Sequence, residues 1–222
     1  MPFRNRSEAG QQLARALARY RDARPVVLAL PRGGAPVAAE IAAALGAPLD
    51  LILVRKIGLP TQPELAMGAV VDGDPPLVVR NDAVIGMARV SEAEFAEACR
   101  RELAEIERRR RRYLAGRARV PVAGRTAIVV DDGVATGATT RAALRAVRAG
   151  RPQRLILAVP VAPTEALAAM RAEADETVCL EDHRDFEAIG RFYDDFHQVA
   201  DDEVLAALAR FPPEAPAANP AS

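Results

Sequence analysis

The residues whose types and spacing indicate chemistry lie between positions 127 and 140. An apolar run at 127–130 is followed by Asp131 and Asp132, and then by small and hydroxyl-bearing residues up to Thr140. The glycines of this stretch allow backbone N–H groups to converge on one point, and the start of a helix adds free donors and partial positive charge. Such a loop is suited to bind a phosphate group.

The two adjacent carboxylates indicate a second ligand group beside that phosphate. Asp131 and Asp132 would repel a phosphate placed directly against them, so they suit a neutral diol, such as a ribose, or a bound Mg²⁺ ion. An isolated pair of aspartates would be read more simply as a strand end, with Thr139 capping the helix that follows. The whole pattern, placed directly after an apolar strand, favours the ligand-binding interpretation.

The stretch resembles the 5-phosphoribosyl-1-pyrophosphate signature of type I phosphoribosyltransferases, which has four apolar residues, two acids and then Thr-Gly-x-Thr. The resemblance extends over roughly residues 25–200. It implies that Asp131 and Asp132 bind the 2′- and 3′-hydroxyls of the ribose. It also implies a 5′-phosphate site formed by Ala135, Thr136, Gly137, Ala138, Thr139 and Thr140.

Two further segments fit a pyrophosphate site. Pro31-Arg32-Gly33-Gly34 follows the first apolar strand, where glycines permit close backbone approach and an arginine can form a bidentate contact. The same four residues also fit an ordinary strand-to-helix turn. Arg55 and Lys56 are expected at the end of the second strand, and Lys56 is the one lysine beside 29 arginines. The resemblance implies that pyrophosphate is bound by Arg32, Gly33, Gly34, Arg55 and Lys56.

The acceptor of the phosphoribosyl group has no clear signature. The resemblance implies a hood over the acceptor at about 181–199, a segment rich in aromatic residues. Phe192 and Tyr193 either stack on the acceptor or pack the core of the hood. Ala135 stands where 6-oxopurine enzymes carry an acid, so hypoxanthine and guanine are expected to be poor acceptors. The resemblance implies that residues 57–76 occupy the place of the family's mobile catalytic loop, and no catalytic residue is assigned there.

The remaining pattern predicts an α/β fold with a mainly parallel five-stranded sheet, helices on both faces and a small hood. Ser91 and Glu94 predict a capping box at the start of a long helix, and 66–80 is compatible with a short hairpin. Residues 1–211 are expected to form one domain, with a disordered tail at 212–222. The expected strands are 26–30, 51–54, 126–130, 154–159 and 177–180, and the expected helices are 7–20, 36–45, 91–112, 139–149, 163–174 and 201–210.

Composition excludes several classes of protein. Net charge is zero, which gives no sign of a nucleic-acid or membrane partner. No G-x-S-x-G elbow, Walker A loop or clustered cysteine and histidine pattern is present, so a serine hydrolase, a P-loop enzyme and a zinc site are not supported. The first ten residues lack the apolar core of a signal peptide, and a cytoplasmic protein is expected.

The functional expectation is a phosphoribosyltransferase that uses Mg²⁺ and phosphoribosyl pyrophosphate, transfers the phosphoribosyl group to a nitrogenous base or similar acceptor, and releases pyrophosphate. Two alternatives remain open: a non-catalytic regulatory protein that binds the same donor, and a hydrolase or phosphorylase of a phosphoribose ester. Sequence does not decide between a monomer and a homodimer.

Overall fold

The centre of the molecule is a parallel five-stranded sheet with the order β2-β1-β6-β7-β8. Its strands are β1 (Val26–Ala29), β2 (Leu49–Leu51), β6 (Thr126–Val130), β7 (Arg154–Pro163) and β8 (Glu176–His183). The computed structural model describes residues 2–63, 65–73 and 75–212, and part of the predicted tail, 213–222, lies outside the described residues. All four strand pairings are parallel, which confirms the predicted fold class.

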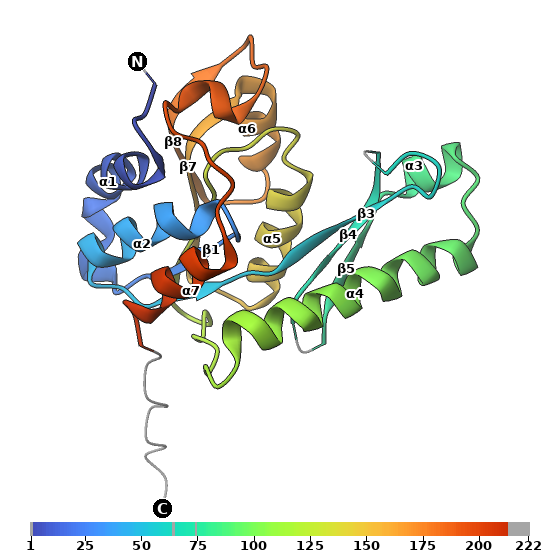
Figure 1. Ribbon diagram of the computed structural model, residues 1–222, viewed down its shortest axis with the longest axis horizontal. Coiled ribbons are helices and arrows are strands. Elements are labelled where there is room, and N and C mark those ends of the chain that lie inside the picture. Colours follow the sequence, from blue (N-terminus) through green and yellow to red (C-terminus); the bar gives the residue numbers. More distant parts are fainter. Residues whose placement is uncertain (1, 64, 74, 213–222) are drawn as a thin grey trace, which may run out of the picture.

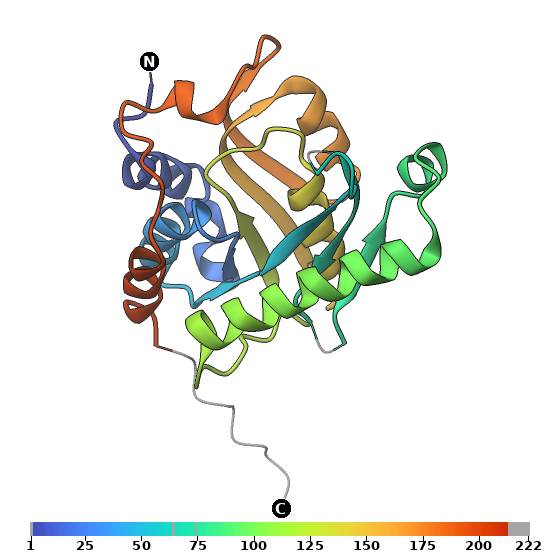
Figure 2. The ribbon, with the colours of Figure 1, turned by 45° about the vertical axis from the view of Figure 1, so that its right-hand side comes forward.

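Helices cover both faces of this sheet. They are α1 (Arg6–Ala16), α2 (Gly34–Leu45), α5 (Ala138–Ala149), α6 (Thr164–Met170) and α7 (Asp201–Ala209), with a 3₁₀ turn η1 (Ala18–Ala23) after α1. Successive strand residues alternate between two cores: in β6, Ile128 packs with α1, α2 and α7 on one face, whereas Val129 packs with α5 and α6 on the other. Figures 1 and 2 show the two helical layers on opposite sides of the strands.

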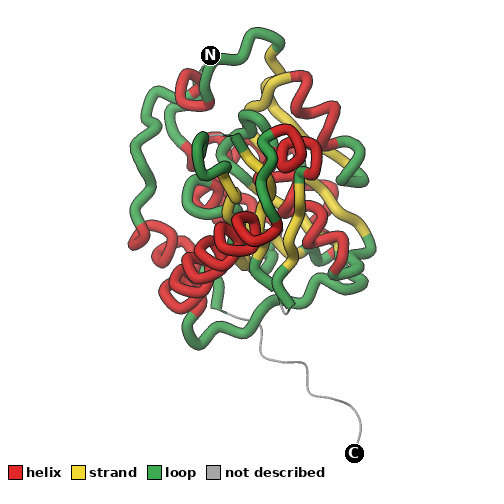
Figure 3. The backbone as a smooth tube through the Cα atoms, turned by 90° about the vertical axis from the view of Figure 1, so that its right-hand side faces the viewer, coloured by secondary structure: helices red, strands yellow, loops and turns green. Residues whose placement is uncertain are grey.

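The part of the chain that connects β2 to β6 forms a second lobe. It consists of an antiparallel sheet of β3 (Val54–Gly58), β4 (Ala66–Val71) and β5 (Leu77–Arg80), followed by α3 (Asp82–Met87) and α4 (Glu92–Leu114). Figure 1 shows this lobe extending away from the main sheet, and Figure 3 views the molecule from its side. The hairpin at 66–80 was predicted, but the separate three-stranded sheet was not. The predicted strand 51–54 is divided between β2 and β3.

Helix starts follow local capping chemistry. At α4, Ser91 and Glu94 form the predicted capping box. At α1, the cap is Asn5, whose side chain accepts a hydrogen bond from the backbone N–H of Glu8 at 3.0 Å. Among the described residues, no helix combines the length and apolar character needed to cross a membrane.

The order of the strands fixes where a ligand is expected. From β1 the chain passes to β2 on one side, and the next strand of the sheet, β6, lies on the other side of β1. The carboxyl ends of β1 and β6 are therefore the topological switch point, where open α/β sheets bind ligands. The predicted phosphoribose and pyrophosphate segments follow these two strands.

Candidate functional site

The turn after β1 lies directly against the turn after β6. A Cβ atom built on Gly33 would lie 2.0 Å from Oδ2 of Asp132, and one on Gly34 would lie 2.6 Å from the carbonyl oxygen of Val130. Real side chains do not tolerate such distances, so both positions require glycine for close approach. This contact confirms that the two predicted segments meet at one edge of the sheet.

Asp132 is buried and forms an ion pair with Arg6, a residue not predicted to belong to the site. Nε of Arg6 donates to Oδ2 of Asp132 at 2.7 Å. The same guanidinium donates to the carbonyl oxygen of His197 at 2.8 Å and lies 3.9 Å from the ring centroid of Phe196. No local signal in the sequence indicates this role, because Arg6 looks like an ordinary residue in the first turn of a helix.

Asp131 lies next to this ion pair and is partly exposed. Its Oδ1 accepts a hydrogen bond from the backbone N–H of Asp132 at 2.9 Å. Burial and the neighbouring charge of Asp132 raise the pKa of Asp131 well above its usual value. Burial also raises the pKa of Asp132, while the hydrogen bond from Arg6 opposes that rise. Such a pair is stabilised by hydrogen-bond donors, such as the hydroxyls of a sugar, or by a cation.

The loop between Asp132 and α5 exposes a helix start without a side-chain cap. Gly137, with φ of +75°, is the N-cap of α5, and as a glycine it offers no side chain to cap the first turn. Thr139 lies inside the helix, so the simpler reading in which it caps the helix is wrong. Free N–H groups at a helix start favour an anion. Of the predicted phosphate-binding residues, Ala135, Thr136 and Ala138 are exposed, Thr139 is partly exposed, and Gly137 and Thr140 are buried.

Close packing fixes the shape of this loop from behind. A Cβ on Gly133 would lie 2.6 Å from Cγ2 of Ile189, and one on Gly137 would lie 2.6 Å from Cε of Met170. The backbone N–H of Val134 donates to the carbonyl oxygen of Val161 in β7 at 3.0 Å. The loop is therefore anchored at Gly133, Val134 and Gly137, while Ala135 and Thr136 between them are exposed.

Arg32 lies in the turn after β1, and the peptide bond between Pro31 and Arg32 is cis. Its side chain is one-third exposed, and its Nη1 atom is 3.8 Å from Oδ1 of Asp201 at the start of α7. Asp201 also pairs with Arg112 at 2.9 Å. Arg32 thus stands at the predicted edge, and its contact with pyrophosphate stays a prediction.

The expected position of Arg55 and Lys56 at the end of the second parallel strand is wrong. Both residues lie within β3 of the antiparallel sheet, paired in register with Val70 and Ala69 of β4. Nε of Arg55 donates to Oε2 of Glu102 on α4 at 2.7 Å. The apolar run continues from β2 into β3 as the chain enters the second lobe, so the pattern gave no sign of the break. A role in pyrophosphate binding stays a prediction for both residues.

The aromatic residues at 186–196 mainly pack against one another and against the N-terminal segment. Tyr193 is 6% exposed, its hydroxyl donates to the backbone carbonyl oxygen of Asp132 at 2.7 Å, and its ring lies 5.4 Å from that of Phe3. The proposed stacking of Tyr193 on an acceptor is therefore not supported, because the ring is enclosed. Phe192 is partly buried and stacks on Phe186 at 5.3 Å. The alternative interpretation, that these rings form a small core, agrees with the packing.

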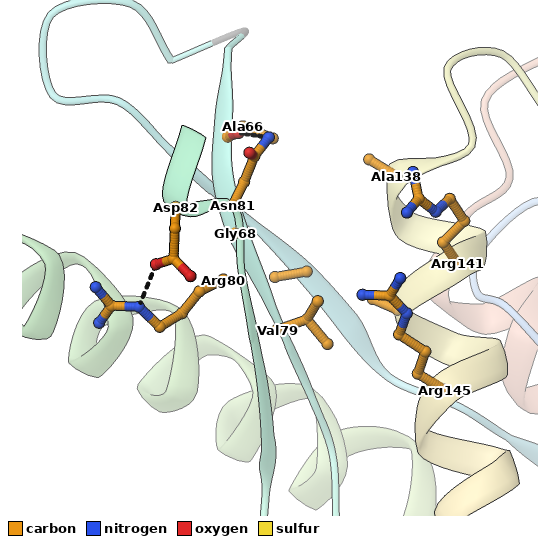
Figure 4. A pocket seen from close by; sticks show the side chains of 11 residues that line it. Ala66, Gly68, Val79, Arg80, Asn81, Asp82, Ala138, Arg141 and Arg145 are labelled. Carbon is orange, nitrogen blue, oxygen red and sulfur yellow. Dashed lines mark hydrogen bonds and ion pairs between the residues drawn. The ribbon is translucent and has the colours of Figure 1, made fainter. Parts of the chain in front are cut away.

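A cavity of about 250 Å³ lies between the hairpin of β4 and β5 and the first turns of α5. Figure 4 shows Arg141 and Arg145 extending from α5 toward the hairpin of β4 and β5, where Arg80 and Asn81 lie. Arg145 is paired with Glu173 at 2.6 Å, so part of its charge is already neutralised. Within the described ranges, no group of three or more histidine, cysteine, aspartate or glutamate residues is arranged to hold a metal ion.

The switch point of this α/β sheet therefore carries a glycine turn packed against Asp132, the neighbouring carboxylate of Asp131, and the glycine-capped start of α5. The family of the phosphoribosyl transferase domain matches residues 5–197 of this chain, and the chain belongs to that family. The matched region includes Arg6, which pairs with Asp132, and His197, whose carbonyl oxygen accepts a hydrogen bond from Arg6.

Relatives with high identity support the assignment to the family. Two proteins of Mycobacterium tuberculosis, from strains CDC 1551 and H37Rv, bear provisional names as phosphoribosyl transferases and are 46% identical over 208 residues. The match covers 94% of this chain but 46% of each relative, so the chain spans about half of their length. The crystal structure of TT1426 from Thermus thermophilus is 42% identical, with a TM-score of 0.82, and the match covers 96% of this chain and 100% of that one.

Proposed function

We propose that this chain binds 5-phosphoribosyl-1-pyrophosphate and transfers its phosphoribosyl group to an acceptor, with release of pyrophosphate. The observation that carries the proposal is the contact of Gly33 with Asp132 at the switch point, beside the uncapped start of α5. Three features lie at one edge of the sheet. They are the start of α5, which favours an anion, the carboxylates of Asp131 and Asp132, which can accept hydrogen bonds, and the glycine turn at 33–34, which permits close approach. These are the parts that a doubly phosphorylated pentose requires.

Each part of the donor has a proposed partner. The 5′-phosphate binds at the backbone of 135–139 and the start of α5, and the ribose hydroxyls donate to Asp131 and Asp132. Pyrophosphate lies toward the turn at 32–34. A nucleophilic atom of the acceptor forms a bond to C1′ while the bond from C1′ to the pyrophosphate oxygen breaks and the electron pair leaves with pyrophosphate. The protein contributes by positioning the reactants and stabilising charge.

The residues present fit a Mg²⁺ ion that arrives with the substrate. Mg²⁺ is usually held by one or two carboxylates together with substrate phosphates rather than by a complete protein cage. Asp131 and Asp132 provide two carboxylates, although one oxygen of Asp132 is bonded to Arg6. Such an ion would neutralise the charge of the departing pyrophosphate.

A thermal-shift experiment tests the proposed donor. Phosphoribosyl pyrophosphate with Mg²⁺, at about one hundred times its Kd, should stabilise the native protein by about 2.7 kcal/mol. For a chain of this size, that corresponds to a rise in Tm of about 5–10 °C. Combined Asp131→Asn and Asp132→Asn should abolish the shift, because the ribose loses its charged acceptors.

The matched control replaces two exposed aspartates, Asp22→Asn and Asp202→Asn, and should keep the full shift. Equal shifts in the site variant and the wild type would refute the assignment of the ribose site. Release of pyrophosphate with a panel of bases then tests catalysis. Tight donor binding without turnover on any base would favour the regulatory alternative.

A further inference from the structure

The contacts of Arg6 connect three parts of the chain that no local motif joins. Its guanidinium, in the first turn of α1, bonds Asp132 after β6 and the carbonyl oxygen of His197, and lies over the ring of Phe196. The side chains of Arg6 and Asp132 are only 8% and 12% exposed. We propose that Arg6 is a positioning residue of the donor site, which holds one oxygen of Asp132 and thereby directs the other toward a ribose hydroxyl.

The proposal rests on the function proposed above and follows from the geometry of the carboxylate. Rotation of an aspartate carboxylate about its last bond is broad and roughly two-fold, so a free Asp132 would present its oxygens in many orientations. The bond from Arg6 to Oδ2 at 2.7 Å selects one orientation. Gly33 lies against the same carboxylate and leaves no space for a large displacement. Oδ1 is then the oxygen that Arg6 does not engage.

Two neighbouring contacts keep the guanidinium itself in place. The bond to the His197 carbonyl oxygen at 2.8 Å uses another nitrogen of the guanidinium, and the ring of Phe196 covers its flat face at 3.9 Å. The ring of Tyr193 stacks on that of Phe196, and its hydroxyl donates to the backbone carbonyl oxygen of Asp132 at 2.7 Å. The segment at 193–197 therefore supports Asp132 both directly, through Tyr193, and through Arg6.

A buried ion pair can also be purely structural, and then its loss would weaken every ligand through unfolding or distortion. A positioning role predicts selective loss instead. Ligands with ribose hydroxyls should depend on Arg6 more strongly than inorganic pyrophosphate, which has no hydroxyl for Asp132 to bind.

The experiment measures Kd by calorimetry for ribose 5-phosphate and for inorganic pyrophosphate with Mg²⁺. Arg6→Gln should weaken ribose 5-phosphate about 10- to 100-fold, the range expected when a hydrogen bond to a charged group loses its geometry. Binding of pyrophosphate should weaken less than binding of ribose 5-phosphate, since pyrophosphate has no hydroxyl that donates to Asp132. The matched control is Arg15→Gln, an arginine near the end of the same helix, which should bind both ligands like the wild type.

Arg6→Lys replaces Arg6→Gln if the latter does not fold. It keeps the charge but loses the planar fork, so ribose 5-phosphate should again weaken more than pyrophosphate. Unchanged binding of ribose 5-phosphate, or an equal loss for both ligands, would overturn the positioning role. If the wild type binds neither ribose 5-phosphate nor phosphoribosyl pyrophosphate, the proposed function is refuted and this inference falls with it.

Discussion

Replacing Gly33 by alanine would drive a methyl group into the carboxylate of Asp132. The added Cβ would lie 2.0 Å from Oδ2, and ordinary contact begins at 3.4 Å, so the two atoms must separate by about 1.4 Å. The carboxylate cannot simply rotate away, because Arg6 bonds the same oxygen at 2.7 Å in a buried setting. The backbone of Gly33 is in the right-handed helical region, so the clash is the cause of the effect rather than the φ angle.

The magnitude follows from this overlap. Forcing one extra methyl group into a packed site costs about 1–3 kcal/mol of the free energy of unfolding. That range corresponds to a decrease in Tm of about 2–12 °C for a chain of this size. The donor should also bind more weakly, because a displacement of about 1 Å in a binding site can cost on the order of 100-fold.

The assay compares Gly33→Ala with Gly86→Ala. A Cβ on Gly86, in α3, meets nothing within 4 Å, so this control should keep or slightly raise Tm and should bind the donor like the wild type. Kd for phosphoribosyl pyrophosphate and Tm are measured for the wild type and both variants. Gly33→Ala that melts like the wild type and binds the donor within about threefold of it would refute the packing argument.

Three further predictions concern the loop, a helix cap and the acceptor. Gly137→Ala should lower Tm more than Gly124→Ala, because both glycines have positive φ but only the Cβ added at Gly137 would meet another atom, Cε of Met170 at 2.6 Å. A larger decrease in Tm for Gly124→Ala would contradict this. Ser91→Ala should lower the free energy of unfolding by about 0.5–2 kcal/mol in a denaturant titration without changing the Kd of the donor, since it removes the cap of α4, and a changed Kd would link α4 to the site. Pyrophosphate release should be about 10²–10⁴-fold slower with hypoxanthine or guanine than with the best of adenine, orotate and uracil, because Ala135 offers no acid or base. Fastest release with hypoxanthine or guanine would refute this.

The central sheet and the edge that carries the site could be predicted because their signals are local. The apolar run before Asp131 and the small residues after it are contiguous, and the glycines at 33–34 directly follow the first apolar strand. Parallel strands bring their carboxyl ends to one edge, so the meeting of the two turns follows from the fold class. The capping box at Ser91 is local in the same way.

The second lobe and the partner of Asp132 could not be predicted, for different reasons. Leu51 and Val54 form one apolar run in the sequence, although they belong to different sheets. Arg6 gives no local signal, because its role depends on a residue 126 positions away. The aromatic ring of Tyr193 indicated burial or stacking, but only the packing against Phe3 decides between them.

The long-range contacts of Arg6 also constrain the order in which the chain can fold. Its bonds to Asp132 and to the carbonyl oxygen of His197 span 126 and 191 positions. Contacts between residues so distant form late, because the entropy of closing large loops must first be offset by other structure. Asp132 is supported by Tyr193 and by Arg6, which is itself held by the carbonyl oxygen of His197. During synthesis, both supports are complete only after residue 197 has emerged. A fragment that carries the signature loop alone would therefore retain the sequence of the site and lack the orientation of its acid.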